Sequence, residues 1–215
     1  MKLAAATLLL LSGCGIVGPR FVGSGVAKTE QREVDPFTAV RVSGQLRLEF
    51  EDAEERSVTL TADDNLLERI ESVVEGGTLH LRAMNGSYTW KTTPTFVVSG
   101  PGVTSFQTGG QSRASVAAGG ADSMTLEAGG QSRIEADVAA DSLTIETSGQ
   151  SRVAVTGTAT KITFDAGGQS EIDVSAVPAE AVAGEASGQS RITHSAADAA
   201  IDRSGQAKVE RSAAR

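Results

Sequence analysis

Aromatic residues are scarce in this chain of 215 residues: six Phe, one Tyr and one Trp make up 4% of it. With 24 glycines as well, the core has to be built from small and branched aliphatic side chains, which favours strands over a helical bundle. Positive charge is also short, because 19 Lys and Arg against 27 Asp and Glu leave a net charge of −8. Nucleic-acid binding requires a basic surface, so this composition argues against it.

Cysteine occurs once, at Cys14, so the chain cannot form an internal disulfide. A basic start precedes an apolar run from Leu3 to Leu11 that is too short to span a bilayer. Residues 1–13 are therefore predicted to be a signal peptide. The stretch Leu11-Ser12-Gly13-Cys14 resembles the lipobox of bacterial lipoproteins, in which the cysteine is acylated after cleavage before it. The alternative is an ordinary signal peptide with an incidental cysteine.

The lipobox resemblance implies an address in the cell envelope. An aspartate after the acylated cysteine favours the inner membrane in lipoproteins, whereas Gly15 follows here and implies the outer membrane. The sequence from Gly15 to about Thr29 is rich in Gly, Ser and Val and has little periodicity. Residues 14–33 are therefore predicted to be an acylated N-terminus and a flexible tether, attached to the membrane through lipid on Cys14.

Residues 34–210 are predicted to form one domain, and its first part, 34–102, shows irregular strand-like alternation. Asp63 and Asp64 can cap one short helix over Asn65–Ser72. Residues 211–215 are predicted to be a C-terminal tail.

Residues 103–210 carry a repeated motif, Gly-Gln-Ser followed by Arg or Glu, with a last degraded copy. Its glutamines lie 20, 19, 19, 20 and 17 residues apart and are Gln111, Gln131, Gln150, Gln169, Gln189 and Gln206. Periods of this length are typical of solenoids. The repeat predicts an all-β fold, a parallel β-helix with coils of about 19–20 residues.

The parity of apolar and charged positions supports stacked strands. Three positions after the glutamines stand mainly aliphatic residues, among them Ile134, Val153 and Ile172. Four positions before them stand polar or acidic residues, and two after them mainly basic ones. Two strands in each coil would point alternate residues inward, whereas a helical period would mix these columns. We expect Ile134, Val153 and Ile172 to form one interior file.

Each part of the motif has an expected role. The glycine before each glutamine predicts a turn that a side chain would obstruct. Coils lie about 4.8 Å apart, so the six glutamines can pass amide hydrogen bonds along a ladder. The serine shares the parity of the interior columns, although the turn leaves its direction open.

No cofactor or metal site is predicted. His80 and His194 lack metal-ligand spacing, and His194 falls in an apolar column, which favours a structural histidine over a ligand. Nucleophile motifs are absent. The glycine-rich segments superficially resemble calcium-binding nonapeptide rolls, but the required aspartate falls on Ile134 and the period is about twice too long.

Two clusters leave a second interpretation open. Asp165, Glu171 and Asp173 form the densest acidic group of the repeats, either a solvated face or a catalytic or sugar-binding cluster. The short, uniform coils offer no insertion to build a cleft, which favours the solvated face. Tyr88 and Trp90 are either an exposed sugar-stacking pair or a cap over the core, and an aromatic-poor chain favours the cap.

The chain resembles the bacterial family described as putative auto-transporter adhesin, head GIN domain. The resemblance covers roughly Val34 to Val209 and rests on four blocks: Phe37 to Gly44, Leu60 to Leu67, Gly77 to Leu81, and the Gly-Gln-Ser series. Its most specific part is Ala62-Asp63-Asp64-Asn65-Leu66-Leu67. It implies a right-handed parallel β-helix in an exported, often lipid-anchored protein. The periodicity alone fits either hand. The family has no established activity and no catalytic residues to transfer.

We therefore expect a non-enzymatic, lipid-anchored envelope protein with a structural or adhesive solenoid, whose partner is a polysaccharide or an envelope protein. The alternative is a carbohydrate-active enzyme that uses Asp165, Glu171 and Asp173, and a third hypothesis is an envelope stress sensor. Its oligomeric state is left open.

Glu171 interrupts a predicted column of stacked arginines between Arg152 and Arg191. Like charges a few ångströms apart repel by about 1 kcal/mol in water. Glu171→Arg should therefore lower the melting temperature modestly, and more so at low salt. Thermal melts over a salt series test this, and an unchanged salt profile would contradict the stacking.

Overall fold

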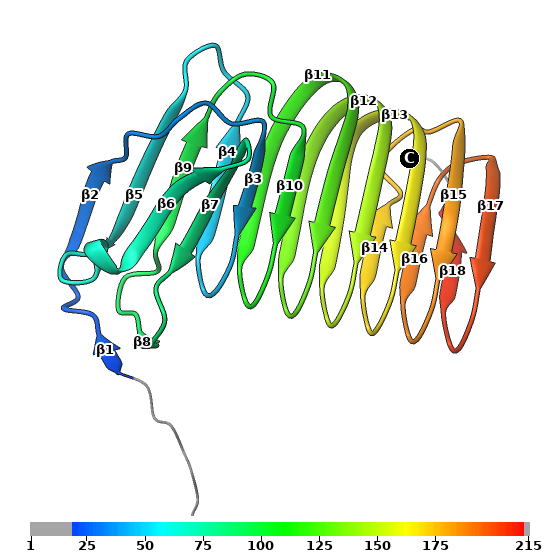
Figure 1. Ribbon diagram of the computed structural model, residues 1–215. Coiled ribbons are helices and arrows are strands. Elements are labelled where there is room, and N and C mark those ends of the chain that lie inside the picture. Colours follow the sequence, from blue (N-terminus) through cyan, green and yellow to red (C-terminus); the bar gives the residue numbers. More distant parts are fainter. Residues whose placement is uncertain (1–18, 213–215) are drawn as a thin grey trace, which may run out of the picture.

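The computed structural model describes residues 19–212. The predicted signal peptide, Cys14 and the last three residues lie outside this range. The chain forms a right-handed parallel β-solenoid: in the parallel coils the strands on the near side run downward, those on the far side run upward, and the coils advance away from the N-terminal end (Figure 1).

The regular coils each contribute one strand to each of two facing sheets. Their strands are β10 (Ser105–Thr108), β11 (Arg113–Ala128), β12 (Arg133–Thr147), β13 (Arg152–Ala166), β14 (Glu171–Val174), β15 (Ala181–Ala186), β16 (Arg191–His194), β17 (Asp198–Arg203) and β18 (Lys208–Arg211). Glycine turns join the sheets along one edge. At the opposite edge β11, β12 and β13 bend over continuously, whereas short loops make that corner in later coils (Figure 1).

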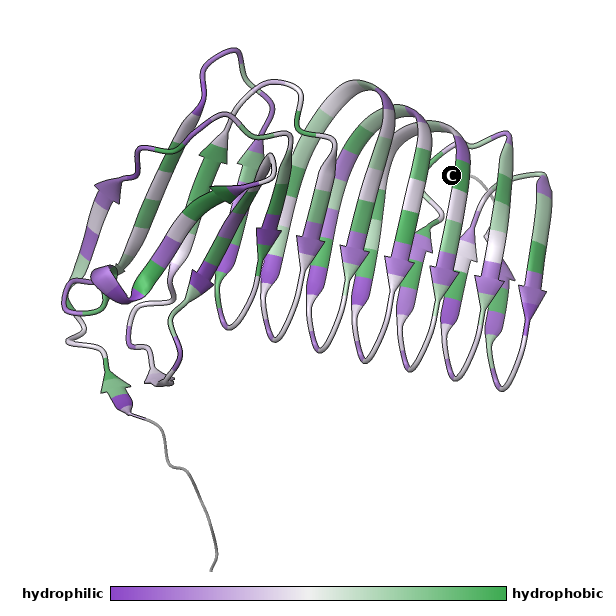
Figure 2. Ribbon diagram, in the orientation of Figure 1, coloured by the Kyte–Doolittle hydropathy of each residue, from purple (hydrophilic) through white to green (hydrophobic). Residues whose placement is uncertain are grey.

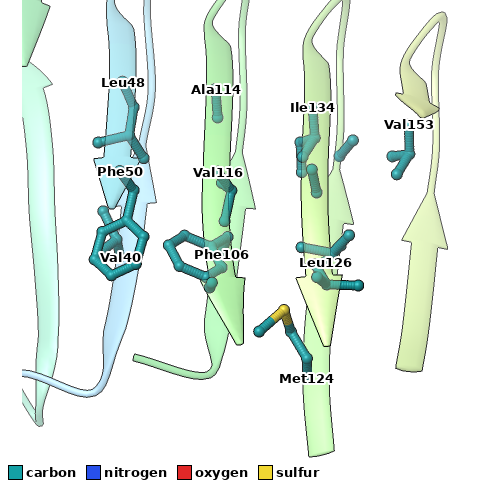
Figure 3. Packing of buried hydrophobic residues seen from close by; sticks show 14 of the residues in the cluster. Val40, Leu48, Phe50, Phe106, Ala114, Val116, Met124, Leu126, Ile134 and Val153 are labelled. Atoms are coloured by element: carbon teal, nitrogen blue, oxygen red, sulfur yellow. The ribbon is translucent and has the colours of Figure 1, made fainter. Parts of the chain in front are cut away.

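Residues one coil apart pair directly, so each interior file consists of equivalent repeat positions. Ile134 pairs with Val153 and Val153 with Ile172, and all three are fully buried. The predicted single file is thus confirmed, and close up Leu48, Ala114, Ile134 and Val153 succeed one another along the axis (Figure 3). Hydrophobic and hydrophilic positions alternate along most strands of the regular coils (Figure 2). The aliphatic side chains at alternate positions are therefore buried, and the charged side chains between them face water.

The N-terminal part adds two parallel coils and then a cap. The coil strands are β3 (Ala39–Val42) and β4 (Arg47–Glu51), followed outward by β7 (Thr78–Ala83) and β9 (Thr95–Ser99). Antiparallel strands close this end: β6 (Ile70–Glu75) pairs with β7, β5 (Ser57–Asp63) with β9, and β2 (Ala27–Gln31) with β5. A separate two-stranded sheet joins β1 (Arg20–Val22) to β8 (Ser87–Thr89) at the lower corner (Figure 1).

The predicted helix over Asn65–Ser72 is reduced to a single 3-10 turn, η1 (Leu67–Arg69). Ile70 already begins β6 and pairs with Ala83. Pairing with β7 buries Ile70 and satisfies its backbone in the sheet, which outweighs a local helical preference.

The predicted tether of residues 14–33 is folded over part of its length. Arg20–Val22 and Ala27–Gln31 are strands, although most of their side chains are exposed. Strands at a cap edge need no apolar face, so they lack the alternation by which the sequence reveals a strand. Strands are therefore present before residue 34, where the sequence placed the start of the domain.

The glycine turns bring backbones into close contact. Gly149 has φ +73°, and a Cβ placed there would lie 2.6 Å from the carbonyl oxygen of Gly130. Gly120 has a similar φ of +76°, but a Cβ would meet nothing within 4 Å.

We predict that Gly149→Ala destabilises the protein more than Gly120→Ala. Both substitutions carry the left-handed cost of about 1–2 kcal/mol, while Gly149→Ala adds an overpacking cost of about 1–3 kcal/mol. Urea titrations of the two variants measure the difference. An equal loss of unfolding free energy in the two variants would show that only the backbone dihedral angle matters at Gly149.

Candidate functional site

The six predicted glutamines line one exposed edge of the solenoid, which we call the glutamine edge. Each amide Nε2 donates to the Oε1 of the next glutamine, over 3.1–3.3 Å, in the order Gln45, Gln111, Gln131, Gln150, Gln169, Gln189 and Gln206. Beneath the side chains, the backbone N–H of each glutamine from Gln111 onward donates to the backbone carbonyl of a glycine one coil earlier, at 2.7 Å. The row is therefore held by both backbone and side-chain hydrogen bonds.

Gln45 extends the row by one coil and was missed from the sequence. Leu46 occupies the place of the motif's serine, and 66 residues separate Gln45 from Gln111. The signal was present as Ser43-Gly44-Gln45, since the same tripeptide precedes Ser151 and Ser190 in the regular repeats. The chain inserted after β4 hid the spacing.

The motif's serines point inward under the turn and are buried. Ser151 Oγ donates to the carbonyl of Ala128 at 2.9 Å, and Ser132 Oγ lies 2.9 Å from Thr108 Oγ1. These bonds satisfy polar atoms in an otherwise apolar interior. Gly-Gln-Ser thus places a tight turn, an outward amide and an inward hydroxyl in succession.

A mainly basic row flanks the glutamine edge on β4, β11, β12, β13, β14, β16 and β18. In register order it contains Arg47, Arg113, Arg133, Arg152, Glu171, Arg191 and Lys208. Glu171 forms an ion pair with Arg152, and Arg133 lies 3.7 Å from Glu135. The side chains are largely solvated, so each pair contributes little to stability. The row forms a positive stripe on an acidic protein.

The opposite sheet carries an acidic row beside the same turns. Its carboxylates are in register and belong to Glu127, Glu146, Asp165, Glu185 and Asp202. Gln107 donates to Glu127 at 3.0 Å at one end of the row. A shallow groove of about 430 Å³ runs past Glu127, Glu146 and Asp165.

The structure separates Asp165 from Glu171 and Asp173. Asp165 lies on β13 in the acidic row, whereas Glu171 on β14 pairs with Arg152 in the other sheet. Asp173 accepts hydrogen bonds from the amide and hydroxyl of Ser175. Each of the three carboxylates lines a different groove. Asp165 is thus separated from the other two, while Glu171 and Asp173 share the outward face of β14, where each is engaged by another side chain, Arg152 and Ser175 respectively.

Aromatic rings stack at the N-terminal end of the glutamine edge, in what we call the aromatic corner: Phe21, Tyr88, Trp90 and Arg69. The centroids of Phe21 and Tyr88 lie 5.2 Å apart and those of Tyr88 and Trp90 4.7 Å apart, while the Arg69 guanidinium sits 4.3 Å from the Phe21 centroid. Trp90 also packs on the core. Trp90 thus packs on the core, as the cap interpretation expects, while Tyr88 stacks on Trp90 without belonging to the core cluster.

Asp63 fastens the first residues of the folded unit to the cap. Its fully buried carboxylate accepts hydrogen bonds from the amides of Gly25 at 2.9 Å, Lys91 at 3.0 Å and Thr92 at 3.2 Å. Burial acts to raise the pKa of Asp63, but the backbone donors of Lys91, Thr92 and Gly25 outweigh it and hold the pKa below its ordinary value. A buried, ionised aspartate therefore ties together three segments.

The two residues after Asp63 complete this clasp. Asn65 Oδ1 accepts from the Ser24 amide at 2.9 Å, and Asn65 Nδ2 donates to the Val22 carbonyl at 3.0 Å. The Asp64 amide donates to the Val26 carbonyl at 2.9 Å. The Asp-Asp-Asn block thus fixes the chain between β1 and β2.

The two histidines lie apart. His80 is on β7, beside Arg41 and Val73 in neighbouring strands. His194 is buried in the last coils, between Val174 and Arg211 in register, and its Nδ1 has no hydrogen-bond partner. Among residues 19–212 no cluster of three or more His, Cys, Asp or Glu is arranged to hold a metal ion. That part of the chain also has no helix long and apolar enough to span a bilayer.

The sequence model of the family described as putative auto-transporter adhesin, head GIN domain matches residues 36–212. The chain belongs to this family. The head GIN resemblance drawn from the sequence is thereby confirmed. No protein of curated function matches the sequence.

Solved structures share the head GIN fold. One, of a putative adhesin from Bacteroides fragilis, has a TM-score of 0.79 at 14% identity and covers 89% of this chain and 100% of that one. Another, of a putative lipid binding protein from Parabacteroides distasonis, has a TM-score of 0.68 at 15% identity, with coverages of 90% and 99%. A putative adhesin from Parabacteroides merdae has a TM-score of 0.62 at 13% identity, also with 90% and 99%. At these identities the likeness concerns the fold.

His194 should make stability depend on pH. Burial and the nearby Arg211 lower its pKa from the ordinary 6.5, more than the Ala196 backbone raises it. The unfolded chain therefore binds a proton that the folded one resists, and the free energy of unfolding falls as pH drops below about 6.5. His194→Val, which copies Val174 in the same file, should flatten this slope in urea melts from pH 7.5 to 5. His80→Gln is the control and should keep it, and an unchanged slope in His194→Val would refute the assignment.

Proposed function

We propose that this protein is a non-enzymatic binding protein of the cell envelope, acylated on Cys14 and held at the outer membrane. Its glutamine edge contacts an extended polysaccharide. The family's description as an adhesin supports binding rather than catalysis, and the lipobox-like Leu11 to Cys14 supports the anchor. The Parabacteroides distasonis neighbour described as a lipid binding protein fits an envelope location.

The exposed row of seven glutamine amides carries the proposal. A primary amide has two N–H donors and two acceptor lone pairs. Each glutamine inside the row uses one donor and one lone pair in hydrogen bonds to its two neighbours, so one donor and one lone pair remain for a ligand. These groups recur about every 4.8 Å on a fixed edge. A polymer with regularly spaced hydroxyls is the ligand that such an array fits.

The basic row gives the edge a preference for anionic sugars. Arginine recognises carboxylate groups through a planar fork of donors. Arg113, Arg133 and Arg152 stand two residues after their glutamines, on the same side of the turn. Because the protein is acidic overall, an anionic chain would meet favourable charge mainly along this stripe.

The carbohydrate-active enzyme gains no support from the acidic residues. Asp165, Glu171 and Asp173 line separate grooves, and Glu171 is engaged by Arg152. Glycoside hydrolysis requires two carboxyl groups on either side of one scissile bond. New reducing ends or unsaturated products from a polysaccharide panel would reverse this conclusion, if Asp165→Asn or Asp173→Asn abolished them.

Binding of uronic-acid and neutral polysaccharides to the mature protein tests the proposal. The double variant Gln131→Ala/Gln150→Ala should weaken binding roughly fivefold or more, since each lost hydrogen bond contributes about 0.5–1.5 kcal/mol. Gln107→Ala is the matched control, because Gln107 bonds Glu127 on the other sheet and should leave affinity unchanged. Equal affinity in the double variant, with its melting curve intact, would remove the glutamine edge from the proposal.

A further inference from the structure

The first strand that the structure describes lies close in sequence to the proposed lipid. Arg20 opens β1 and is six positions after Cys14. A fully extended chain covers at most about 3.3–3.6 Å per residue, so β1 lies within roughly 20 Å of the acylated sulfur. The Asp63-Asp64-Asn65 clasp holds the residues that follow β1 against the cap. The point of entry is therefore a fixed part of the solenoid, which a long flexible tether would not provide.

The chain's single Trp and single Tyr both lie at this point of entry. β1 pairs with β8, and Phe21 of β1 stacks on Tyr88, which stacks on Trp90. Trp and Tyr are enriched where proteins meet the interface between bilayer and water, because their rings are apolar and their tips are polar. A protein so poor in aromatic residues places these two beside its proposed anchor.

Exposed apolar side chains accompany the rings. Among residues 19–212, Val22 in β1 is 50% exposed and Met84, just before β8, is 39% exposed. The Tyr88 hydroxyl donates to the Met84 carbonyl at 2.8 Å, which ties Met84 to the stack. Leaving such side chains in water has a cost that burial in lipid would remove.

Basic groups surround the same corner. Arg20 is exposed, the Arg69 guanidinium covers the outer ring of the stack, and Lys91 Nζ reaches the Ser24 carbonyl at 3.3 Å. Basic side chains near a membrane are attracted to anionic headgroups. On a protein with a net charge of −8, this is a favourable place to approach an anionic surface.

We propose that the aromatic corner, together with Val22 and Met84, docks on the phospholipid surface that carries the lipid anchor. Val22 and Met84 enter the boundary between headgroups and acyl chains, Tyr88 and Trp90 lie at headgroup level, and Arg20 and Lys91 contact lipid phosphates. This docking rests on the proposed acylation of Cys14, since one lipid anchor and one weak surface contact strengthen each other.

Docking also orients the glutamine edge. Gln45 shares a hollow of about 430 Å³ with Tyr88 and Trp90, so the edge starts at the aromatic corner. The Gln45 end then lies nearest the lipid, and the edge continues from there toward Gln206. The solenoid would thus be fixed at the membrane by its cap.

Trp90 reports on its own surroundings, because it is the only tryptophan. The mature acylated protein is reconstituted into anionic phospholipid vesicles with or without bromine on the acyl chains, and its fluorescence is recorded. Brominated lipid should quench Trp90, and vesicles should shield it from aqueous acrylamide compared with protein in detergent. Vesicles of zwitterionic lipid should give weaker quenching.

The double variant Val22→Asp/Met84→Asp should lose at least half of the bromine quenching while remaining in the vesicles through its lipid. Both side chains are exposed, so the fold should persist, which thermal melts verify. Val97→Asp is the matched control: Val97 on β9 is 51% exposed and lies outside the aromatic corner. It should keep full quenching.

The outcomes separate the docking from the anchor. Protein that sits in the vesicles with Trp90 unquenched would overturn the docking and leave the proposed function intact. Protein that fails to enter the vesicles would overturn both, because the docking depends on the acylated Cys14. Quenching that survives Val22→Asp/Met84→Asp would also remove these two side chains from the contact.

Discussion

The close approach of backbones at the glycine turns is the constraint on which the solenoid depends. The backbone N–H of each glutamine in the regular coils donates to a glycine carbonyl one coil earlier at 2.7 Å. The two backbones are so close there that a Cβ would not fit at positions such as Gly149. This contact sets the register of every coil on the one before it. Once register is fixed, aliphatic residues fall over aliphatic ones inside, and amides and charges form rows outside. The main role of the motif is therefore to align each coil with the one before it, and the row of glutamines results from that alignment.

The regular coils could be predicted because the information that specifies them is local and repeated. Apolar and polar side chains alternate within one strand, and the same alternation recurs about twenty residues later. These two facts alone are enough to place Ile134 next to Val153 in the stack. The N-terminal part lacks this redundancy. There β3 and β4 form a coil, and the chain next forms β5 and β6 at the end of the solenoid. Only afterwards does it form β7, which lies between β3 and β6, and β9, which lies between β4 and β5. Pairings between strands so far out of sequence order leave no period to detect, which is why Gln45, the strand at Ile70 and the strands before residue 34 escaped prediction.

Stacking separates residues that are close in sequence and unites those that are far apart. Asp165 and Glu171 are six positions apart, yet the glycine turn between them sends one to each sheet. Asp165 instead neighbours Glu146 and Glu185 in adjacent coils. Side chains of one kind on such a scaffold are consequently organised in rows that run along the axis.

The two ends of the solenoid are built differently. Within residues 19–212, antiparallel strands cover the first coil, whereas β17 pairs with β15 alone and β18 with β16 alone. Between the ends, each regular coil pairs only with the coil before it and the coil after it, so another twenty-residue unit could be inserted there without changing the other pairings. Tandem duplication within the regular coils would therefore lengthen the solenoid by whole turns while the first coils stayed the same.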